Sequence, residues 1–170
     1  GIVLLSILYS AIFYDQSVEK AYGQLKIYMN VYSEEFRSAE FSEETAQALS
    51  EQLGGSRVTF LLRDGTVIAD TEADGALESH LEREEVQEAL SGGEGYSVRQ
   101  SATLRENLVY YCRLFEGSFQ LQDGTQEEGV LVRIAVKADS GFAIFADALP
   151  TMVWFLIVYI MCCLFVAWLA

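Results

Sequence analysis

The residues from Ala148 to Ala170 form an uninterrupted stretch of 23 residues without a charged side chain. A helix needs about 20 mostly apolar residues to cross a hydrocarbon core of ~30 Å, because each residue adds ~1.5 Å. A charge at the centre of a bilayer costs at least ~2.5 kcal/mol, so a long uncharged stretch is informative. The alternative is a helix buried in a protein core, for which this stretch is long. We therefore expect residues 148–170 to form a transmembrane helix.

Residues 1–14 are also apolar and uncharged, but this stretch is too short to cross a bilayer by itself. It lacks the basic segment of a secretory signal peptide. We expect it to be the C-terminal part of a first transmembrane helix. Residues 15–147, which contain every charged residue of the chain, would then form one domain between two spans.

The net charge of −14 therefore belongs to residues 15–147 alone. Such a surface repels phosphate backbones, which argues against nucleic-acid binding. It is compatible with cations, cationic peptides, neutral or zwitterionic small molecules, and other protein surfaces as partners. An acidic domain between two spans is also compatible with a location outside the cytoplasm.

A heptad pattern follows the first apolar segment. Its members are spaced alternately by four and three residues, as at the a and d positions of a coiled coil: Val18, Tyr22, Leu25, Met29, Tyr32 and Phe36. This seam could pair two copies of the protein and carry a signal along the helix. It could equally lie on the domain's own sheet, and three heptads do not separate the two interpretations.

The rest of the domain reads as two shorter helices and five strands. Ser42 is a good N-cap for a helix that stops at Gly54-Gly55, and Ser79 opens a second helix in a capping-box pattern. Asp64-Gly65 between two β-prone runs indicates a tight hairpin, and Asp123-Gly124 indicates another hairpin tip. The expected strands are 57–63, 66–70, 96–101, 108–115 and 129–137. Successive strands on short connections predict an α+β fold with an antiparallel sheet.

The segment RVTFLLRDGTVIAD, residues 57–70, is similar to the strand-turn-strand opening of extracytoplasmic PAS-like (Cache-type) sensor domains. These domains occur in bacterial membrane histidine kinases of the phosphate-regulon-sensor type. Further segments resemble the same family in their order and spacing: 80–95, 97–101, 109–111 and 129–136. The resemblance covers about residues 43–140. Residues 116–128 make a longer excursion between the last two strands than the family leads us to expect.

The resemblance implies an antiparallel sheet of about five strands between a long N-terminal helix and a shorter helix-loop face, flanked by transmembrane helices. It also implies a homodimeric receptor in the bacterial cell membrane, with residues 15–147 outside the cytoplasm. Binding of a small molecule, a cation or a protein would be passed through the second span to a cytoplasmic histidine kinase that uses ATP and Mg²⁺. One alternative is a membrane-anchored envelope interaction module without kinase output. Another is the same sensor attached to a chemoreceptor or to a cyclic-dinucleotide enzyme.

Sequence signals for catalysis within residues 1–170 are missing. His80 is the only histidine, and its surroundings do not match the His-Glu-x-x-x-Pro box of a phosphoacceptor. We expect it to be an exposed residue at the start of a helix. The sequence has no Gly-x-Ser-x-Gly elbow and no phosphate-binding loop. Cys112 stands alone in the domain, without the spacing of a metal site. We expect no enzymatic activity, cofactor or metal site in this part of the receptor.

Two groups of carboxylates allow either a functional or a purely structural interpretation. The members are Glu34, Glu35, Glu40, Glu43 and Glu44 in one group, and Glu82, Glu84, Glu85 and Glu88 in the other. An acidic face could bind Ca²⁺ or Mg²⁺ against anionic lipid headgroups. The spacing of an EF-hand is missing, which favours a solvated helix surface.

The candidate ligand-binding residues are Arg99, Tyr111, Arg113 and Arg133 on the predicted strands. An arginine beside a tyrosine on the inner face of a sheet can hold a carboxylate or a phosphate, because guanidinium offers paired donors. The alternative is that these arginines pair with the abundant acidic side chains.

Overall fold

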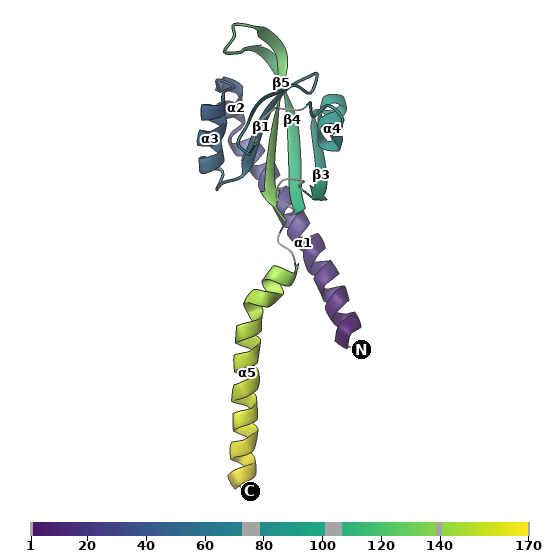
Figure 1. Cartoon of the computed structure of the whole chain (residues 1–170), viewed down its shortest axis with the longest axis vertical. Coiled ribbons are helices and arrows are strands. Elements are labelled where there is room, and N and C mark those ends of the chain that lie inside the picture. Colours follow the sequence, from purple (N-terminus) through teal and green to yellow (C-terminus); the bar gives the residue numbers. More distant parts are fainter. Residues whose placement is uncertain (1, 73–78, 101–106, 139–140, 170) are drawn as a thin grey trace. The chain divides into compact units, whose positions relative to one another are not determined.

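The computed structural model describes the chain except for residues 1, 73–78, 101–106, 139–140 and 170 (Figure 1). The chain divides into two compact units. One is Val18–Ala138, and the other combines Gly1–Ser17 with Asp139–Ala170.

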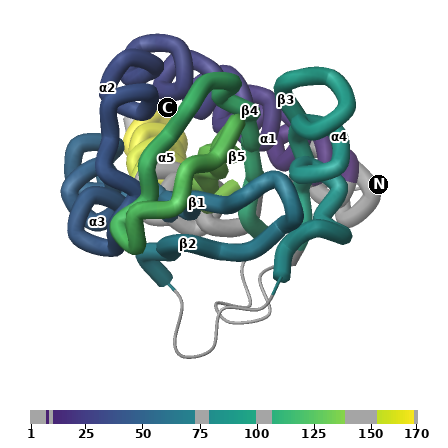
Figure 2. The backbone as a smooth tube through the Cα atoms, turned by 90° about the horizontal axis from the view of Figure 1, so that it is seen from above, coloured from purple at the N-terminus to yellow at the C-terminus, as the bar shows by residue number. Residues whose placement is uncertain are grey.

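The unit Val18–Ala138 is built on a five-stranded antiparallel sheet with the strand order β2-β1-β5-β4-β3. The strands are β1 (Arg57–Leu62), β2 (Val67–Asp70), β3 (Glu94–Gln100), β4 (Asn107–Gln120) and β5 (Gln126–Lys137). The last strand of the chain, β5, lies in the middle of the sheet between β1 and β4 (Figure 2). The predicted α+β fold with five antiparallel strands is confirmed.

The hairpin predicted at Asp64-Gly65 joins β1 to β2. Gly65 has a φ of +83°, a conformation that glycine adopts without strain. The Asp64 carboxylate accepts a hydrogen bond from the backbone N–H of Thr66 at 2.9 Å. A side chain at position 65 would also collide with the backbone of Leu81, so glycine is required there twice over.

The excursion at residues 116–128 is a continuation of the β4–β5 hairpin. Its tip lies at Asp123-Gly124, as predicted, with Gly124 at a φ of +84°. The predicted end of the strand at Phe115 is wrong, because β4 runs on to Gln120 past a register shift between Glu116 and Phe119. Beyond the shift, the Phe119 ring packs edge-on against Phe41 at 5.5 Å between centroids, which anchors the added length.

Helices cover both faces of the sheet. They are α1 (Ile2–Val31), α2 (Ser33–Ser38), α3 (Glu43–Gln52) and α4 (Glu84–Gly92). Helices α3 and α4 lie on opposite sides of the sheet (Figures 1 and 2). The predicted N-cap of α3 is confirmed, since the Ser42 hydroxyl accepts a hydrogen bond from the Thr45 N–H at 3.1 Å. Helix α4 begins at Glu84 instead of the predicted Ser79, because Arg83 is the residue with extended backbone that precedes the first turn.

The heptad seam packs within the domain. Leu25, Met29 and Phe36 are fully buried in the single chain. The Tyr22 ring lies against the rings of Tyr96 on β3 and Tyr111 on β4, with centroids 4.6 and 5.8 Å away. Of the two interpretations that the sequence left open, the structure favours the seam on the domain's own sheet. A role of these residues between two copies stays a prediction.

Helix α5 (Gly141–Leu169) belongs to the other unit. Within the residues that the structure describes, no helix combines the length and the apolar character needed to cross a membrane. The spans expected over residues 1–14 and 148–170 are thus not shown. Asp139 and Ser140 are residue types that favour a helix N-cap, and they lie outside the described residues.

The packing of the seam can be tested with two residues of α1. We expect Leu25→Ala to lower the free energy of unfolding by about 2–5 kcal/mol, because it leaves a cavity in the core. Glu19→Ala is the control, since Glu19 is exposed and its truncation should change stability by less than about 0.5 kcal/mol. Urea denaturation followed by circular dichroism measures both. Equal effects of the two substitutions would contradict the intradomain packing of the seam.

Candidate functional site

The four candidate ligand residues lie on opposite faces of the sheet. Arg133 on β5 is paired with Cys112 on β4, so these two side chains share a face. Tyr111 and Arg113, on either side of Cys112, necessarily point to the other face. The structure therefore does not bring the four residues together. Arg99 and Arg133 face α4, whereas Tyr111 and Arg113 face α1.

On the α4 face, charged side chains from five elements form what we call the buried ion cluster. Its members are Arg57 of β1, Asp70 of β2, Glu85 of α4, Arg99 of β3 and Arg133 of β5. The hydroxyls of Thr59 and Ser97 lie among them. Strands β1, β2, β3 and β5 each contribute a residue at a position where side-chain alternation directs it toward α4.

Arg133 is the central cation of this cluster and is only 1% exposed. Its Nη2 donates to the Thr59 hydroxyl at 3.1 Å and lies 3.5 Å from Asp70 Oδ2, while its Nη1 lies 3.4 Å from Glu85 Oε1. Its Nε is buried and finds no hydrogen-bond partner among the described residues. Burial lowers the pKa of Arg133, since removing a cation from water is costly, and Glu85 and Asp70 oppose that effect.

Glu85 is the carboxylate that α4 contributes to the cluster, and it is fully buried. Arg99 donates from Nη1 to Oε2 at 2.6 Å and from Nη2 to Oε1 at 2.8 Å. The Ser97 hydroxyl donates to Oε2 at 2.6 Å. Burial alone would raise the pKa of Glu85, but the hydrogen bonds from Arg99 and Ser97 outweigh it and lower the pKa to about 2. Glu85 is therefore ionised at any physiological pH.

Asp70 and Arg57 form a second two-pronged pair across the β1–β2 hairpin. Arg57 donates from Nε to Oδ1 and from Nη2 to Oδ2, both at 2.8 Å. The Asp70 carboxylate also accepts from the Thr59 hydroxyl at 3.1 Å. Burial would raise the pKa of Asp70, but hydrogen bonding and attraction by Arg57 leave it below its usual value. The cluster thus contains three guanidinium groups and two buried carboxylates, and Glu72 adds a third carboxylate whose Oε2 lies 3.8 Å from Arg57 Nη1.

The Tyr110 ring packs against two arginines of the cluster. The Arg99 guanidinium carbon lies 3.8 Å above its centroid, and that of Arg133 lies 5.3 Å away. A cation over a tyrosine face is attracted by the ring quadrupole. The ring therefore helps to hold two like-charged groups close together.

His80 lies half-buried ahead of α4, and the expectation of an exposed residue at a helix start is wrong. Its backbone N–H donates to the Gly65 carbonyl at 2.9 Å, which fixes it against the β1–β2 hairpin instead of in a helix. Its Nδ1 is buried without a hydrogen-bond partner among the described residues. Burial, followed by repulsion from Arg133 and Arg83, lowers the pKa of His80 to about 4.

On the opposite face, Glu94 at the start of β3 ties that edge strand to α1. Its Oε1 accepts from Lys26 Nζ at 3.0 Å, and its Oε2 accepts from the Tyr111 hydroxyl and from Arg113 Nη2. Arg113 also donates from Nη1 to Asn30 Oδ1 at 2.8 Å. The hydrogen bonds from Tyr111 and then Lys26 lower the pKa of Glu94 to about 2. Tyr111 and Arg113 therefore hold α1 to the sheet.

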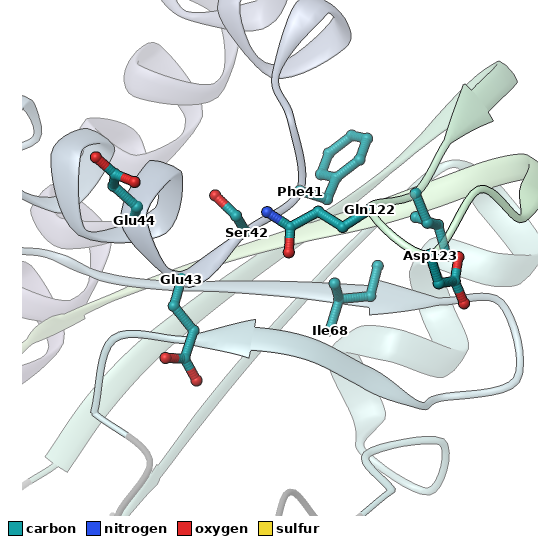
Figure 3. A pocket seen from close by; sticks show the side chains of 8 residues that line it. Phe41, Ser42, Glu43, Glu44, Ile68, Gln122 and Asp123 are labelled. Carbon is teal, nitrogen blue, oxygen red and sulfur yellow. The ribbon is translucent and has the colours of Figure 1, made fainter.

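A surface pocket of about 620 Å³ lies between the start of α3, strand β2 and the tip of the β4–β5 hairpin (Figure 3). Phe41, Ser42, Glu43, Glu44, Ile68, Leu121, Gln122 and Asp123 line it. It contains two members of the acidic groups seen in the sequence. In the part of the chain that the structure describes, no three or more His, Cys, Asp or Glu side chains are arranged to hold a metal ion.

Sequence reasoning found Arg99 and Arg133 but missed the carboxylates that pair with them. Glu85 was grouped with the solvated acidic residues of its helix. Its spacing carries a signal, however, because it lies one turn before Ala89 and beside Val86, which are both buried. Asp70 ends a strand and shows no comparable signal.

No protein-family model and no characterised protein matches the sequence. Among solved structures, the sensor domain of Escherichia coli DcuS is similar with a TM-score of 0.45 and 11% identity, covering 74% of this chain and 92% of that one. The ligand-binding domain of the Campylobacter jejuni chemoreceptor Tlp3, in complex with 4-methylisoleucine, has a TM-score of 0.39 and 15% identity, covering 74% and 60%. Similarities at this level establish neither a common fold nor a common function.

The environment of His80 predicts a measurable titration. Because its pKa is lower in the folded chain than the ordinary 6.5, the unfolded chain binds a proton more readily between pH 6.5 and 4. The stability that depends on a neutral His80 in the folded chain is therefore fully present above pH 6.5 and is lost as the pH falls toward 4. Since His80 is the only histidine, the proton on its Cε1 gives one NMR signal, and we expect the titration of that signal to have its midpoint near pH 4. A midpoint near 6.5 in the folded chain would show that the ring is free in water.

Proposed function

We propose that residues 15–147 are the extracytoplasmic signal-sensing domain of a bacterial two-component sensor histidine kinase. Two observations support the proposal. The segments between residues 43 and 140 resemble such PAS-like sensors in order and spacing, and the five-stranded antiparallel sheet has the form which that resemblance implies. The kinase that uses ATP and Mg²⁺, and the membrane spans at residues 1–14 and 148–170, are part of the proposal.

The input that we propose is a small anionic molecule that binds at the buried ion cluster. The observation that carries this is Arg133, a fully buried guanidinium whose Nε has no hydrogen-bond partner in the described part of the chain. A buried donor without a partner costs about 1–3 kcal/mol, and a carboxylate or phosphate lying beside Nε and one Nη would satisfy it.

The output would require two copies of the receptor and a movement of the helices that enter the membrane. Leu25, Met29 and Phe36 of the heptad pattern are buried in the domain core, so the exposed side of α1 is the better candidate for pairing two copies. Ile27 and Val31, one turn apart on that side, are 56% and 65% exposed. A ligand changes the balance between two states of such a pair by binding one of them more tightly. The same sensing could serve a chemoreceptor or a cyclic-dinucleotide enzyme as output.

Anion sensing can be tested by thermal denaturation of the full chain in detergent. Acetate, succinate, citrate and phosphate are added at constant ionic strength, with sodium chloride as the reference. We expect at least one of them to raise the melting temperature with saturation, because a ligand that binds only the folded state stabilises it. Arg133→Lys, which keeps the charge but loses the planar fork, should reduce the shift.

The matched control is Arg63→Lys, since Arg63 is an exposed cation that pairs with Glu116 at 3.4 Å on the surface. This variant should respond to the anion as the unchanged chain does. Equal responses of the Arg133 and Arg63 variants, or no response of the unchanged chain to any anion, would overturn the proposed input.

The location is tested separately in bacterial cells. With residues 15–147 outside the cytoplasm, protease added to spheroplasts should cleave the domain while a cytoplasmic marker protein stays intact. Protection of the domain until the inner membrane is disrupted would contradict the proposed topology.

A further inference from the structure

We propose that Glu85 is an internal ligand of the sensor, whose carboxylate occupies the guanidinium groups that an anionic signal would use, so that the signal binds by displacing it. The identity of the signal rests on the proposed function. The occupation of the site by Glu85 does not, and it can be tested separately.

The contacts of Glu85 are those that a bound carboxylate would make. Both of its oxygens are engaged by the Arg99 fork at 2.6 and 2.8 Å. The Ser97 hydroxyl adds a third donor at 2.6 Å, and Arg133 Nη1 lies 3.4 Å from Oε1. Fork-to-carboxylate pairing with extra neutral donors is how proteins hold free carboxylates. The site therefore has the chemistry of an anion site that already contains its anion.

Glu85 differs from the other carboxylate of the cluster in the element that carries it. Asp70 lies on β2 and pairs with Arg57 on the neighbouring strand, so it is fixed within the sheet. Its Oδ1 also accepts from the backbone N–H of Glu72 at 3.1 Å. Among the described members of the cluster, Glu85 alone comes from outside the sheet. An incoming anion can therefore replace Glu85 without breaking a strand pairing.

Replacing Glu85 would loosen one of the attachments of α4 to the sheet. The other attachments are the hydrogen bond from the Tyr96 N–H to Glu88 Oε2 at 3.0 Å and the apolar packing of Val86 and Ala89 in a buried cluster with Leu61, Cys112 and Leu131. Helix α4 ends at Gly92 with Gly93 as its C-cap, and the next residue is Glu94, whose carboxylate holds Lys26 of α1 at 3.0 Å. A displacement of α4 would therefore move Glu94 and, through its ion pair with Lys26, α1. Glu85 is in this sense the connection between occupancy of the site and the position of α1.

The experiment removes the internal carboxylate and supplies an external one. Glu85→Ala leaves Arg99 and Arg133 without this counter-charge, so we expect the melting temperature to fall, because an uncompensated buried charge is destabilising. Acetate should then raise it again with saturation, while sodium chloride at equal ionic strength should not. The unchanged chain should show no response to acetate in the concentration range that rescues the variant.

Glu88→Ala is the matched control, because Glu88 lies one turn further along the same helix, is exposed, and its carboxylate accepts from the backbone N–H of Tyr96 and from no arginine among the described residues. Acetate should not change its melting temperature. If acetate affects the Glu85 and Glu88 variants equally, the internal-ligand inference is overturned.

Glu85→Gln keeps the inference testable if the alanine variant does not fold. The amide keeps the shape and can still accept from Arg99 and Ser97, but it carries no charge to compete with an external anion. We expect isothermal titration to give about tenfold tighter succinate binding to this variant than to the unchanged chain, because the site is no longer partly occupied. Unchanged affinity would overturn the inference.

The two proposals can fail independently. Acetate rescue of Glu85→Ala without anion binding by the unchanged chain would support the internal ligand and remove the anionic signal. Binding of an anion by the unchanged chain, with no rescue and no gain in the glutamine variant, would support the signal and remove the internal ligand.

Discussion

The side of the sheet that faces α4 is organised around one constraint, which is the charge of Arg133 in the middle of a sheet. A guanidinium that is 1% exposed needs counter-charges and hydrogen-bond acceptors, and no single neighbouring strand can supply them all. Asp70 from the edge hairpin and Glu85 from α4 provide the carboxylates, and Thr59 provides a hydroxyl. The position of α4 over the sheet is therefore set by electrostatics as well as by its apolar contacts. Gly95 permits the close contact, since a side chain there would collide with the Glu85 carbonyl.

The two faces of the sheet have different physical characters. The face toward α1, α2 and α3 has an apolar and aromatic core, with Phe36 against Phe115 and Phe41 against Phe60, and the ionic contacts of Glu94 lie at its β3 edge. Burial of such rings is the main source of stability and depends little on the exact geometry. The face toward α4 is partly ionic, and its energy depends on distances of a few tenths of an ångström. The sensing role that we propose would benefit from this division, because one face can rearrange its contacts while the other keeps the domain folded.

The sequence predicted those parts of the fold that depend on neighbouring residues. The hairpin at Asp64-Gly65 and the Ser42 cap follow from local backbone chemistry, and the five strands follow from β-prone runs between turn residues. The parts that were missed depend on register and on packing between distant segments. Strand register placed Arg99 and Arg133 on one face and Tyr111 and Arg113 on the other. Likewise, nothing near Glu85 in the sequence marks Arg99 and Arg133 as its partners, which lie 14 and 48 residues away.

The central place of β5 in the sheet has a consequence for how the chain folds. The β1–β2 hairpin and the Arg57–Asp70 pair are local, since the two partners are 13 positions apart, so they can form early during synthesis. The bond between Arg133 and Thr59 spans 74 residues and requires the last strand of the chain to insert between β1 and β4. Contacts that close such long loops form slowly. Until β5 arrives, the early hairpin presents an open strand edge, and the nascent domain is most prone to aggregation at that stage.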